Sequence, residues 1–135
     1  MGRSRGGLTT KVHLIVDAIG LPLRFQVTEG ERHDSLPAKA LFRAVDTRCL
    51  LADRAYDSDE IREALALAGA QAVIPGRRSR AKKIDFDRDL YKARSEVECT
   101  FNLLKQARRF ATRYEKTVRN YIGIIALSCA MLWLR

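Results

Sequence analysis

The stretch CLLADRAYDSDEIREALALAGAQAVIP, residues 49–75, decides the fold of this chain. It opens on a short apolar run, 49–52, of the kind that forms a buried strand. A helix is predicted over 61–68, for which residues 57–60 supply N-cap oxygens and first-turn carboxylates. A second short strand is predicted over 71–75. Strand, helix and strand in this order indicate a parallel βαβ unit.

Upstream of this unit the sequence predicts a β-hairpin. Two β-rich runs, 9–16 and 21–28, flank a short turn that contains Asp17 and Gly20. We expect no element before this hairpin, so one edge of its sheet has no obvious cover. A short helix beginning near Pro37 is expected to follow.

Downstream, residues 76–89 hold six basic and almost no apolar residues, which predicts a mobile basic loop. A helix is expected from Leu90 onward, and a second one over 116–134. The apolar part of the second helix, 121–134, is shorter than the roughly 20 residues that span a bilayer, so we expect it to be buried.

The charge of the chain is concentrated in its second part. Residues 1–75 hold 10 Lys and Arg against 10 Asp and Glu, whereas residues 76–135 hold 15 against 6. The whole net charge of +9 therefore lies in residues 76–135. Such a basic region indicates a polyanionic partner, most simply nucleic acid, although a solvated basic face without a ligand has the same charge.

Other features exclude several classes of protein. Three scattered cysteines without a Cys-x-x-Cys motif argue against a zinc site or a disulfide framework and for a reducing compartment. No secretion signal is evident, because the first residues are basic and glycine-rich with no apolar run behind them. We therefore expect a cytoplasmic, soluble chain with no membrane partner.

The helix from Leu90 carries a polar stripe that borders its apolar face. At about 100° per residue, four polar side chains fall within a stripe about 60° wide. The apolar face beside them is built from Ala93, Val97, Phe101 and Leu104. The stripe consists of Tyr91, Arg94, Glu98 and Lys105. A carboxylate held there suits a site, although an ordinary surface helix with an Arg94–Glu98 ion pair would show the same pattern.

A second carboxylate, Asp53, follows the predicted strand at 49–52. The carboxyl ends of parallel strands are where α/β folds place their ligands. The alternative is a structural role, in which Asp53 caps the turn that follows it.

With these residues in place, the chain resembles the DDE transposases of insertion sequences, in their IS-five-like branch. The family signature Y-(2)-R-(3)-E-(6)-K is matched in full by Tyr91, Arg94, Glu98 and Lys105. Three further segments, 2–11, 51–57 and 108–116, resemble the run before the second strand, the strand with the second catalytic Asp, and the basic run after the catalytic helix.

The resemblance implies an α/β fold of the RNase H-like type, a mixed sheet with flanking helices. It makes residues 1–135 a single partial DDE catalytic domain, with a hairpin and βαβ part over 1–75, the basic loop over 76–89 and the helices over 90–135. The family's first catalytic Asp lies on a strand upstream of residue 2, so we expect the first strand to be missing and the chain alone to be inactive.

The resemblance also implies a metal site. In the family three carboxylates hold two Mg²⁺ or Mn²⁺ ions, and Asp53 and Glu98 match the second and third. Asp17 and Asp34 do not match the first; we expect Asp17 in the hairpin turn and Asp34 as a helix cap. His13 and His33 lack the spacing of metal ligands, so a structural role is expected for both.

The implied partner is DNA, both the ends of the insertion sequence and its target. Tyr91, Arg94 and Lys105 are expected to contact the DNA backbone beside Glu98. The basic residues expected to bind DNA are Arg77, Arg78, Arg80, Lys82, Lys83, Arg108, Arg109, Arg113 and Lys116. A second copy of the chain, or the product of an upstream reading frame, is a further expected partner.

The leading functional hypothesis is therefore DNA transposition by two-metal strand cleavage and transfer, with this chain as a fragment or second reading frame of the transposase. One alternative is a DNA-binding remnant that cuts nothing, which the absent first Asp favours. Another is an RNase H-like nuclease unrelated to mobile DNA, against which the signature and the basic run after Glu98 argue.

Overall fold

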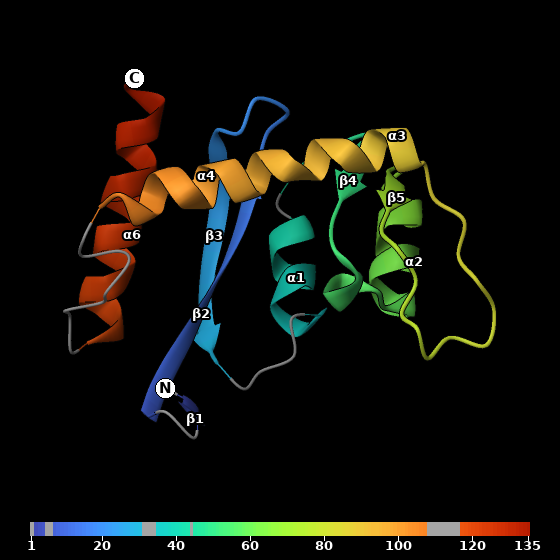
Figure 1. The fold of residues 1–135 in the computed structure, drawn as a ribbon, viewed down its shortest axis with the longest axis horizontal. Coiled ribbons are helices and arrows are strands. Elements are labelled where there is room, and N and C mark those ends of the chain that lie inside the picture. The colour runs from blue at the N-terminus through green and yellow to red at the C-terminus, as the bar shows by residue number, and fades with distance from the viewer. Residues whose placement is uncertain (1, 5–6, 31–34, 44, 108–116) are drawn as a thin grey trace. The chain divides into compact units, whose positions relative to one another are not determined.

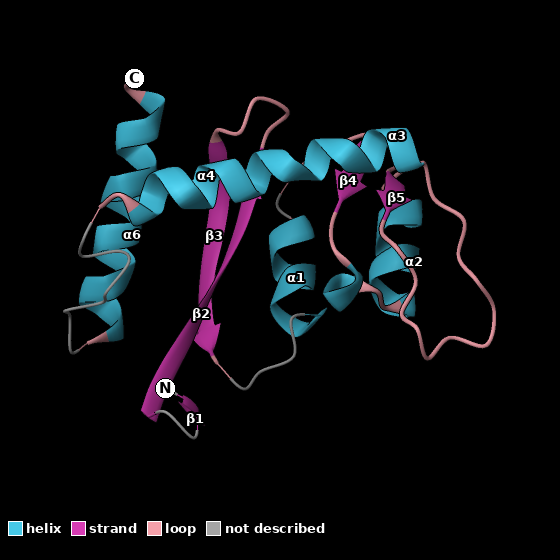
Figure 2. Cartoon of the chain, in the orientation of Figure 1, coloured by secondary structure: helices cyan, strands magenta, loops and turns pink. Residues whose placement is uncertain are grey.

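The fold of this chain is mixed α/β with several helices, as the sequence predicts (Figure 2). Its described strands pair within two small sheets, and the single mixed sheet of the RNase H-like type stays a prediction. The chain divides into two compact units. Unit 1 comprises residues 1–31 and 95–135, and unit 2 comprises residues 32–94. The residues that this computed structural model describes are 2–4, 7–30, 35–43, 45–107 and 117–135.

Unit 1 contains a three-stranded antiparallel sheet in the order β1-β2-β3. The predicted hairpin is confirmed: β2 (Gly7–Val16) pairs with β3 (Pro22–Glu29), from Thr10 opposite Glu29 to Val16 opposite Pro22. The expectation that no element precedes the hairpin is wrong, because β1 (Gly2–Ser4) pairs with the beginning of β2. The edge of β2 is therefore covered over its first residues.

The hairpin turn is closed by Asp17, as expected. Its Oδ1 accepts hydrogen bonds from the backbone N–H of Ile19 (3.0 Å) and of Leu21 (2.9 Å). Gly20 has a φ of 87°, a left-handed conformation that glycine adopts without steric cost. The carbonyl of Gly20 also accepts a hydrogen bond of 2.5 Å from the hydroxyl of Thr100, so the turn is tied to the helix α4.

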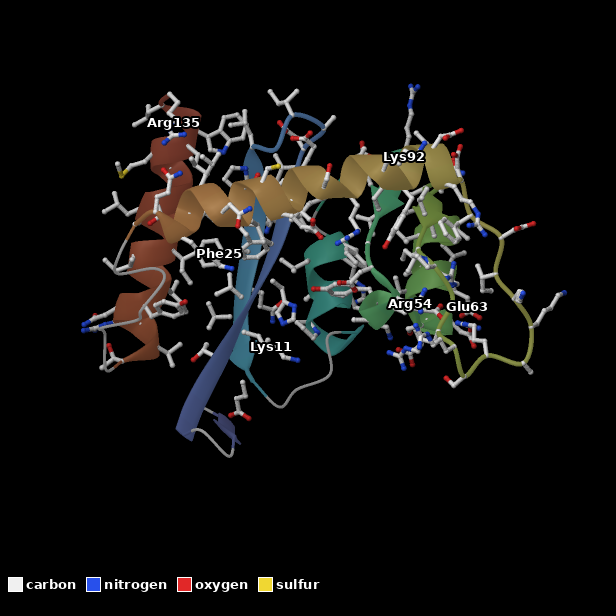
Figure 3. The ribbon with its side chains drawn as sticks, in the orientation of Figure 1. Lys11, Phe25, Arg54, Glu63, Lys92 and Arg135 are labelled. Atoms are coloured by element: carbon white, nitrogen blue, oxygen red, sulfur yellow. The ribbon has the colours of Figure 1, made fainter. Side chains whose placement is uncertain are left out.

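Two helices, α4 (Ser95–Lys105) and α6 (Val118–Trp133), complete unit 1 (Figure 1). They pack on one face of the β2–β3 hairpin, and Figure 3 shows Phe25 among the side chains of this region. Alternate residues of the two strands supply that face, as the twofold repeat of a strand requires. The buried members of this core are Leu104, Tyr121, Ile125 and Cys129, against which Val12, Leu14, Phe25, Val27, Phe101 and Leu132 pack.

The prediction that the apolar segment 121–134 is buried is wrong for most of its surface. Its buried residues, Tyr121, Ile125 and Cys129, recur every four positions and therefore form a single narrow face. Leu127 and Met131 are each 61% exposed. Apolar composition predicts a helix here, but only one side of that helix meets the sheet.

Unit 2 contains the predicted parallel βαβ unit. Strand β4 (Cys49–Leu51) pairs with β5 (Gln71–Val73) in parallel, and α2 (Asp59–Leu67) connects them. Helix α1 (Ser35–Phe42) begins where Pro37 suits a first helical turn. The core of the unit consists of Ala38, Leu50, Ile61, Leu65, Ala70 and Ile74.

The start of α2 differs from its prediction. Asp59 and Glu60 lie in the first turn, where carboxylates are favourable, but the N-cap residue Ser58 makes no side-chain capping bond. Asp57 does not cap the helix either, because its carboxylate is bound to arginine side chains. At the other end, Gly69 follows the helix with a φ of 73°.

The helical segment that begins after the basic loop is not one regular helix. A short α3 (Arg88–Tyr91) passes into the 3₁₀ turn η2 (Lys92–Arg94), and α4 begins at Ser95. In α4 Thr100 and Leu104 are buried, whereas Ala93, expected on the apolar face, is exposed in η2. The predicted apolar face therefore holds for α4 and fails before it.

Candidate active site

Asp53 directly follows the parallel strand β4 and is half-buried. It is the N-cap of the 3₁₀ turn η1 (Arg54–Tyr56), and its Oδ1 accepts a 2.9 Å hydrogen bond from the N–H of Ala55. The structure therefore confirms the capping role of Asp53, which the sequence left open as an alternative. The cap uses Oδ1, and within the described part of the chain no residue donates to the other carboxylate oxygen, Oδ2.

Tyr91 and Arg94 belong to unit 2, in α3 and η2. The guanidinium carbon of Arg94 lies 5.5 Å from the centre of the Tyr91 ring, a cation–π geometry. Phe86 packs its ring against the Tyr91 ring edge-on, with centroids 5.3 Å apart. Two members of the signature are therefore in contact with each other.

Glu98 and Lys105 belong to unit 1 and lie seven residues apart on α4. Both side chains are exposed, and two helical turns place them on the same side of the helix. The wheel assumed one regular helix, and η2 interrupts that helix between Arg94 and Glu98. A common stripe for all four signature residues therefore stays a prediction.

Asp57 is the centre of a charged cluster that the sequence analysis did not predict. Its side chain is 0% exposed, yet it accepts a 2.9 Å hydrogen bond from Nε of Arg62. Arg80 donates to both of its oxygens, from Nε at 2.6 Å and from Nη2 at 2.8 Å. The backbone N–H of Arg77 adds a bond of 2.7 Å. We call Asp57, Arg62, Arg80 and the N–H of Arg77 the Asp57 cluster.

The cluster controls the ionisation of Asp57. Burial raises the pKa of this carboxyl, but the hydrogen bonds from Arg80, the Arg77 N–H and Arg62 outweigh burial and hold the pKa far below its usual range. Asp57 is therefore ionised at neutral pH, and each arginine has a buried counter-ion.

The basic loop is held at its beginning and exposed beyond it. Arg80 and the N–H of Arg77 are bound within the Asp57 cluster, which anchors the first residues of the loop, and the mobility of the loop stays a prediction. Arg78, Lys82 and Lys83 are exposed, and no hydrogen bond or ion pair joins them to any residue that the structure describes. We call these three residues the tip cations.

Comparison with known proteins agrees with this assembly of residues. The family described as "Transposase DDE domain" matches residues 2–133. The chain belongs to the DDE transposases.

Two curated relatives carry the same functional name. A protein of Brucella ovis named as a transposase for insertion sequence element IS6501 is 44% identical over 132 residues, which cover 95% of this chain and 100% of that protein. A protein of Burkholderia cepacia named as a transposase for insertion sequence element IS402 is 30% identical over 142 residues, covering 96% of this chain and 64% of that protein. No solved structure matches the chain.

DDE transposases generally use divalent metal ions, and the oxygen donors of Asp53 suit a hard cation such as Mg²⁺. Among the described residues no group of three or more His, Cys, Asp and Glu side chains is gathered to hold a metal ion. Asp53 lies in unit 2 and Glu98 in unit 1, so their approach to each other stays a prediction.

Four residues of this DDE transposase that are predicted to bind DNA lie outside the described part of the chain: Arg108, Arg109, Arg113 and Lys116. The predicted helix cap Asp34 and the residue His33, for which a structural role is expected, lie outside it as well. His13 does have a structural partner, since its Nε2 lies 2.8 Å from the hydroxyl of Thr28 in the neighbouring strand. None of the helices in the described ranges is long and apolar enough to cross a membrane.

Proposed function

We propose that this chain contributes two metal-binding carboxylates, Asp53 and Glu98, to the strand cleavage and transfer reactions of an insertion sequence of the IS-five-like branch. The observation that carries the proposal is the state of Asp53. One carboxylate oxygen is fixed by the turn η1, and the other has no donor among the described residues. A carboxylate fixed in this way loses little further freedom when it binds a cation.

In this proposal the two units form one catalytic domain of the RNase H-like type, which brings Asp53 and Glu98 together. These two residues, with a further carboxylate, would hold Mg²⁺ or Mn²⁺. When bound, such ions activate the attacking oxygen and stabilise the leaving oxygen of an in-line displacement at phosphorus. Residues 1–135 match the family motifs with these two carboxylates only, so we do not expect a polypeptide of these residues alone to cleave DNA.

The remaining signature residues position the DNA beside the metal ligands. Arg94 presents a planar fork of donors to a phosphate and Lys105 a point charge, while the ring of Tyr91 supports Arg94. The positive charge of residues 76–135 supplies the longer-range attraction for the insertion-sequence ends and the target. A cytoplasmic location and association with a second copy or an upstream reading-frame product belong to the same proposal.

The experiment is Mg²⁺-dependent cleavage of a supercoiled plasmid that carries the element's ends, with the protein expressed from the complete insertion sequence. We expect Asp53→Asn to abolish cleavage because it removes a ligand charge. Asp85→Asn, an equal charge change at an exposed position of the basic loop, should cleave like the unmodified protein. Cleavage by Asp53→Asn at the unmodified rate would refute the proposal, and an unmodified protein that binds DNA without cutting it would favour a non-catalytic DNA-binding protein.

A further inference from the structure

The Asp57 cluster connects two parts of unit 2 to which the proposed function gives different roles. One is the turn η1, which lies between Asp53 and Asp57; its first residue, Arg54, is labelled in Figure 3. The other is the basic loop that follows β5. Arg77 and Arg80 reach back from this loop to Asp57, across 20 and 23 residues of sequence.

The same contacts hold the turn that carries Asp53. Ala55 donates its N–H to Asp53 and accepts, at its carbonyl, a 3.2 Å hydrogen bond from Nη2 of Arg77. A residue of the basic loop and the candidate metal ligand are therefore bound to one and the same residue. Movement of the loop at Arg77 would be transmitted to the cap on Asp53.

Two residues of the loop, Gly76 and Ile84, also lie against each other. A Cβ atom placed on Gly76 would lie 3.1 Å from Cγ1 of Ile84, so the Ile84 side chain packs against the backbone of Gly76. Arg62 adds a 2.7 Å hydrogen bond from Nη2 to the carbonyl of Ile74, just before the loop. These contacts fix the base of the segment 77–83. We call this base, Gly76 and Ile84, the neck of the basic loop.

Arg80 is unsuited to be a DNA contact. Its Nε and Nη2 are already bound to Asp57, and Nη2 also lies 2.8 Å from Oδ1 of Asp59. To bind a phosphate it would have to leave the buried carboxylate of Asp57 with less compensation, which is strongly unfavourable in a group closed to solvent. The exposed tip cations, Arg78, Lys82 and Lys83, have no such commitment among the described residues.

We propose that Asp57 is a positioning residue, which uses Arg80 and Arg62 to fix the turn of Asp53 to the neck of the basic loop, so that Arg78, Lys82 and Lys83 face the DNA. This rests on the proposed function for its DNA partner. The nine basic residues expected from the sequence to bind DNA are thereby divided, because Arg80 belongs to the scaffold and Arg78 to the contact surface.

A matched pair of variants tests the division. Arg78→Gln and Arg80→Gln remove the same charge from the same loop, two positions apart. DNA binding is measured by fluorescence anisotropy with a short duplex, over a range of about 50 to 300 mM salt. Each lost phosphate contact reduces the magnitude of the slope of log K against log salt by about 0.9. We expect this reduction for Arg78→Gln. Arg80→Gln should keep the slope, because the three tip cations are intact, but bind DNA more weakly at each salt concentration, because the loop is no longer held toward the DNA.

Hydrogen exchange of the Arg77 amide, followed by NMR, reports on the cluster itself because this N–H is bound to Asp57. Protection should fall in Arg80→Gln and stay high in Arg78→Gln. Arg80→Lys retains the charge, but a lysine cannot donate to both oxygens of Asp57 as the guanidinium does. This variant should therefore keep the salt slope and still lose protection of the Arg77 amide. In both Arg80 variants Asp57 keeps the hydrogen bonds from Arg62 and from the Arg77 N–H, so its charge stays partly compensated and the variants are expected to fold.

The proposal is overturned if Arg80→Gln lowers the slope as Arg78→Gln does while the Arg77 amide stays protected, since Arg80 would then contact DNA and anchor nothing. It is equally overturned if Arg78→Gln leaves the slope unchanged. An unmodified protein without salt-dependent DNA binding would refute the DNA part of the proposed function and, with it, the assignment of the tip cations. Exchange at Arg77 would still decide whether Asp57 and Arg80 form an anchor.

Discussion

Replacing Glu98 by glutamine is expected to abolish excision of the insertion sequence, while the variant protein keeps its affinity for DNA. The substitution keeps the size of the side chain and removes the negative charge that a metal ligand needs. Loss of groups that merely orient metal ligands costs about 10–100-fold in metal affinity or activity, so loss of a ligand should cost more than about 100-fold. Glu98 is exposed on α4, so its replacement should not disturb the fold.

The measurement is the frequency of excision from a donor plasmid in cells, with DNA affinity of the purified protein alongside. Glu96→Gln provides the control, because it makes the same change of charge on the same helix, in the first turn of α4. We expect Glu96→Gln to excise normally. Normal excision by Glu98→Gln would show that the family's third carboxylate has been assigned to the wrong residue.

The second large effect concerns stability. Asp57→Asn is expected to lower the free energy of unfolding by about 3 kcal/mol at neutral pH, the lower end of the range for breaking a buried ion pair. The lower end applies because the Arg62 and Arg80 side chains are 18% and 24% exposed and stay partly solvated. Asp46→Asn, at an exposed position of the same unit, should change the free energy of unfolding by less than about 0.5 kcal/mol.

The effect depends on pH in a defined direction. The pKa of Asp57 in the folded chain is far below its value of about 4 in the unfolded chain. Its ionised form therefore stabilises the fold at every pH above about 4, and this contribution is lost progressively as the pH falls below that value. Urea unfolding of the unmodified chain and Asp57→Asn at pH 7, 5 and 2.5 should give a difference that is constant at the first two and smaller at the third. A pH-independent difference would mean that Asp57 is not ionised in the fold.

Local patterns in the sequence predicted the elements that depend on neighbouring residues. The hairpin follows from two β-rich runs around a turn with Asp17 and Gly20, and the structure confirms both the strand pairing and the turn. The parallel unit follows from two apolar runs on either side of an amphipathic helix. In both cases the residues that decide the structure lie within one turn or one connection of each other.

Contacts between distant segments were not predictable in the same way. Asp57 looks like a helix cap because Ser58 and Asp59 follow it, and its partner Arg80 lies 23 residues away in a loop without regular structure. Apolar content predicted the helix α6 but could not tell how much of its surface the sheet covers. The 3₁₀ turn at Lys92–Arg94 is marked by no glycine or proline, so a regular helix was the natural expectation.

The candidate site combines both kinds of inference. Motif spacing assigns Asp53 and Glu98, and the structure explains how Asp53 is held through Ala55. The pairing of the two carboxylates depends on the arrangement of two units rather than on any local pattern.

The most direct test of this pairing is a crystal structure of the complete protein with Mn²⁺ and a DNA end. Ions that share a two-metal site lie about 4 Å apart, so we expect the carboxylates of Asp53 and Glu98 within about 8 Å of each other, with the manganese between them. Manganese bound elsewhere, with Asp53 and Glu98 on opposite faces of the protein, would contradict the assignment of these two residues as one metal site.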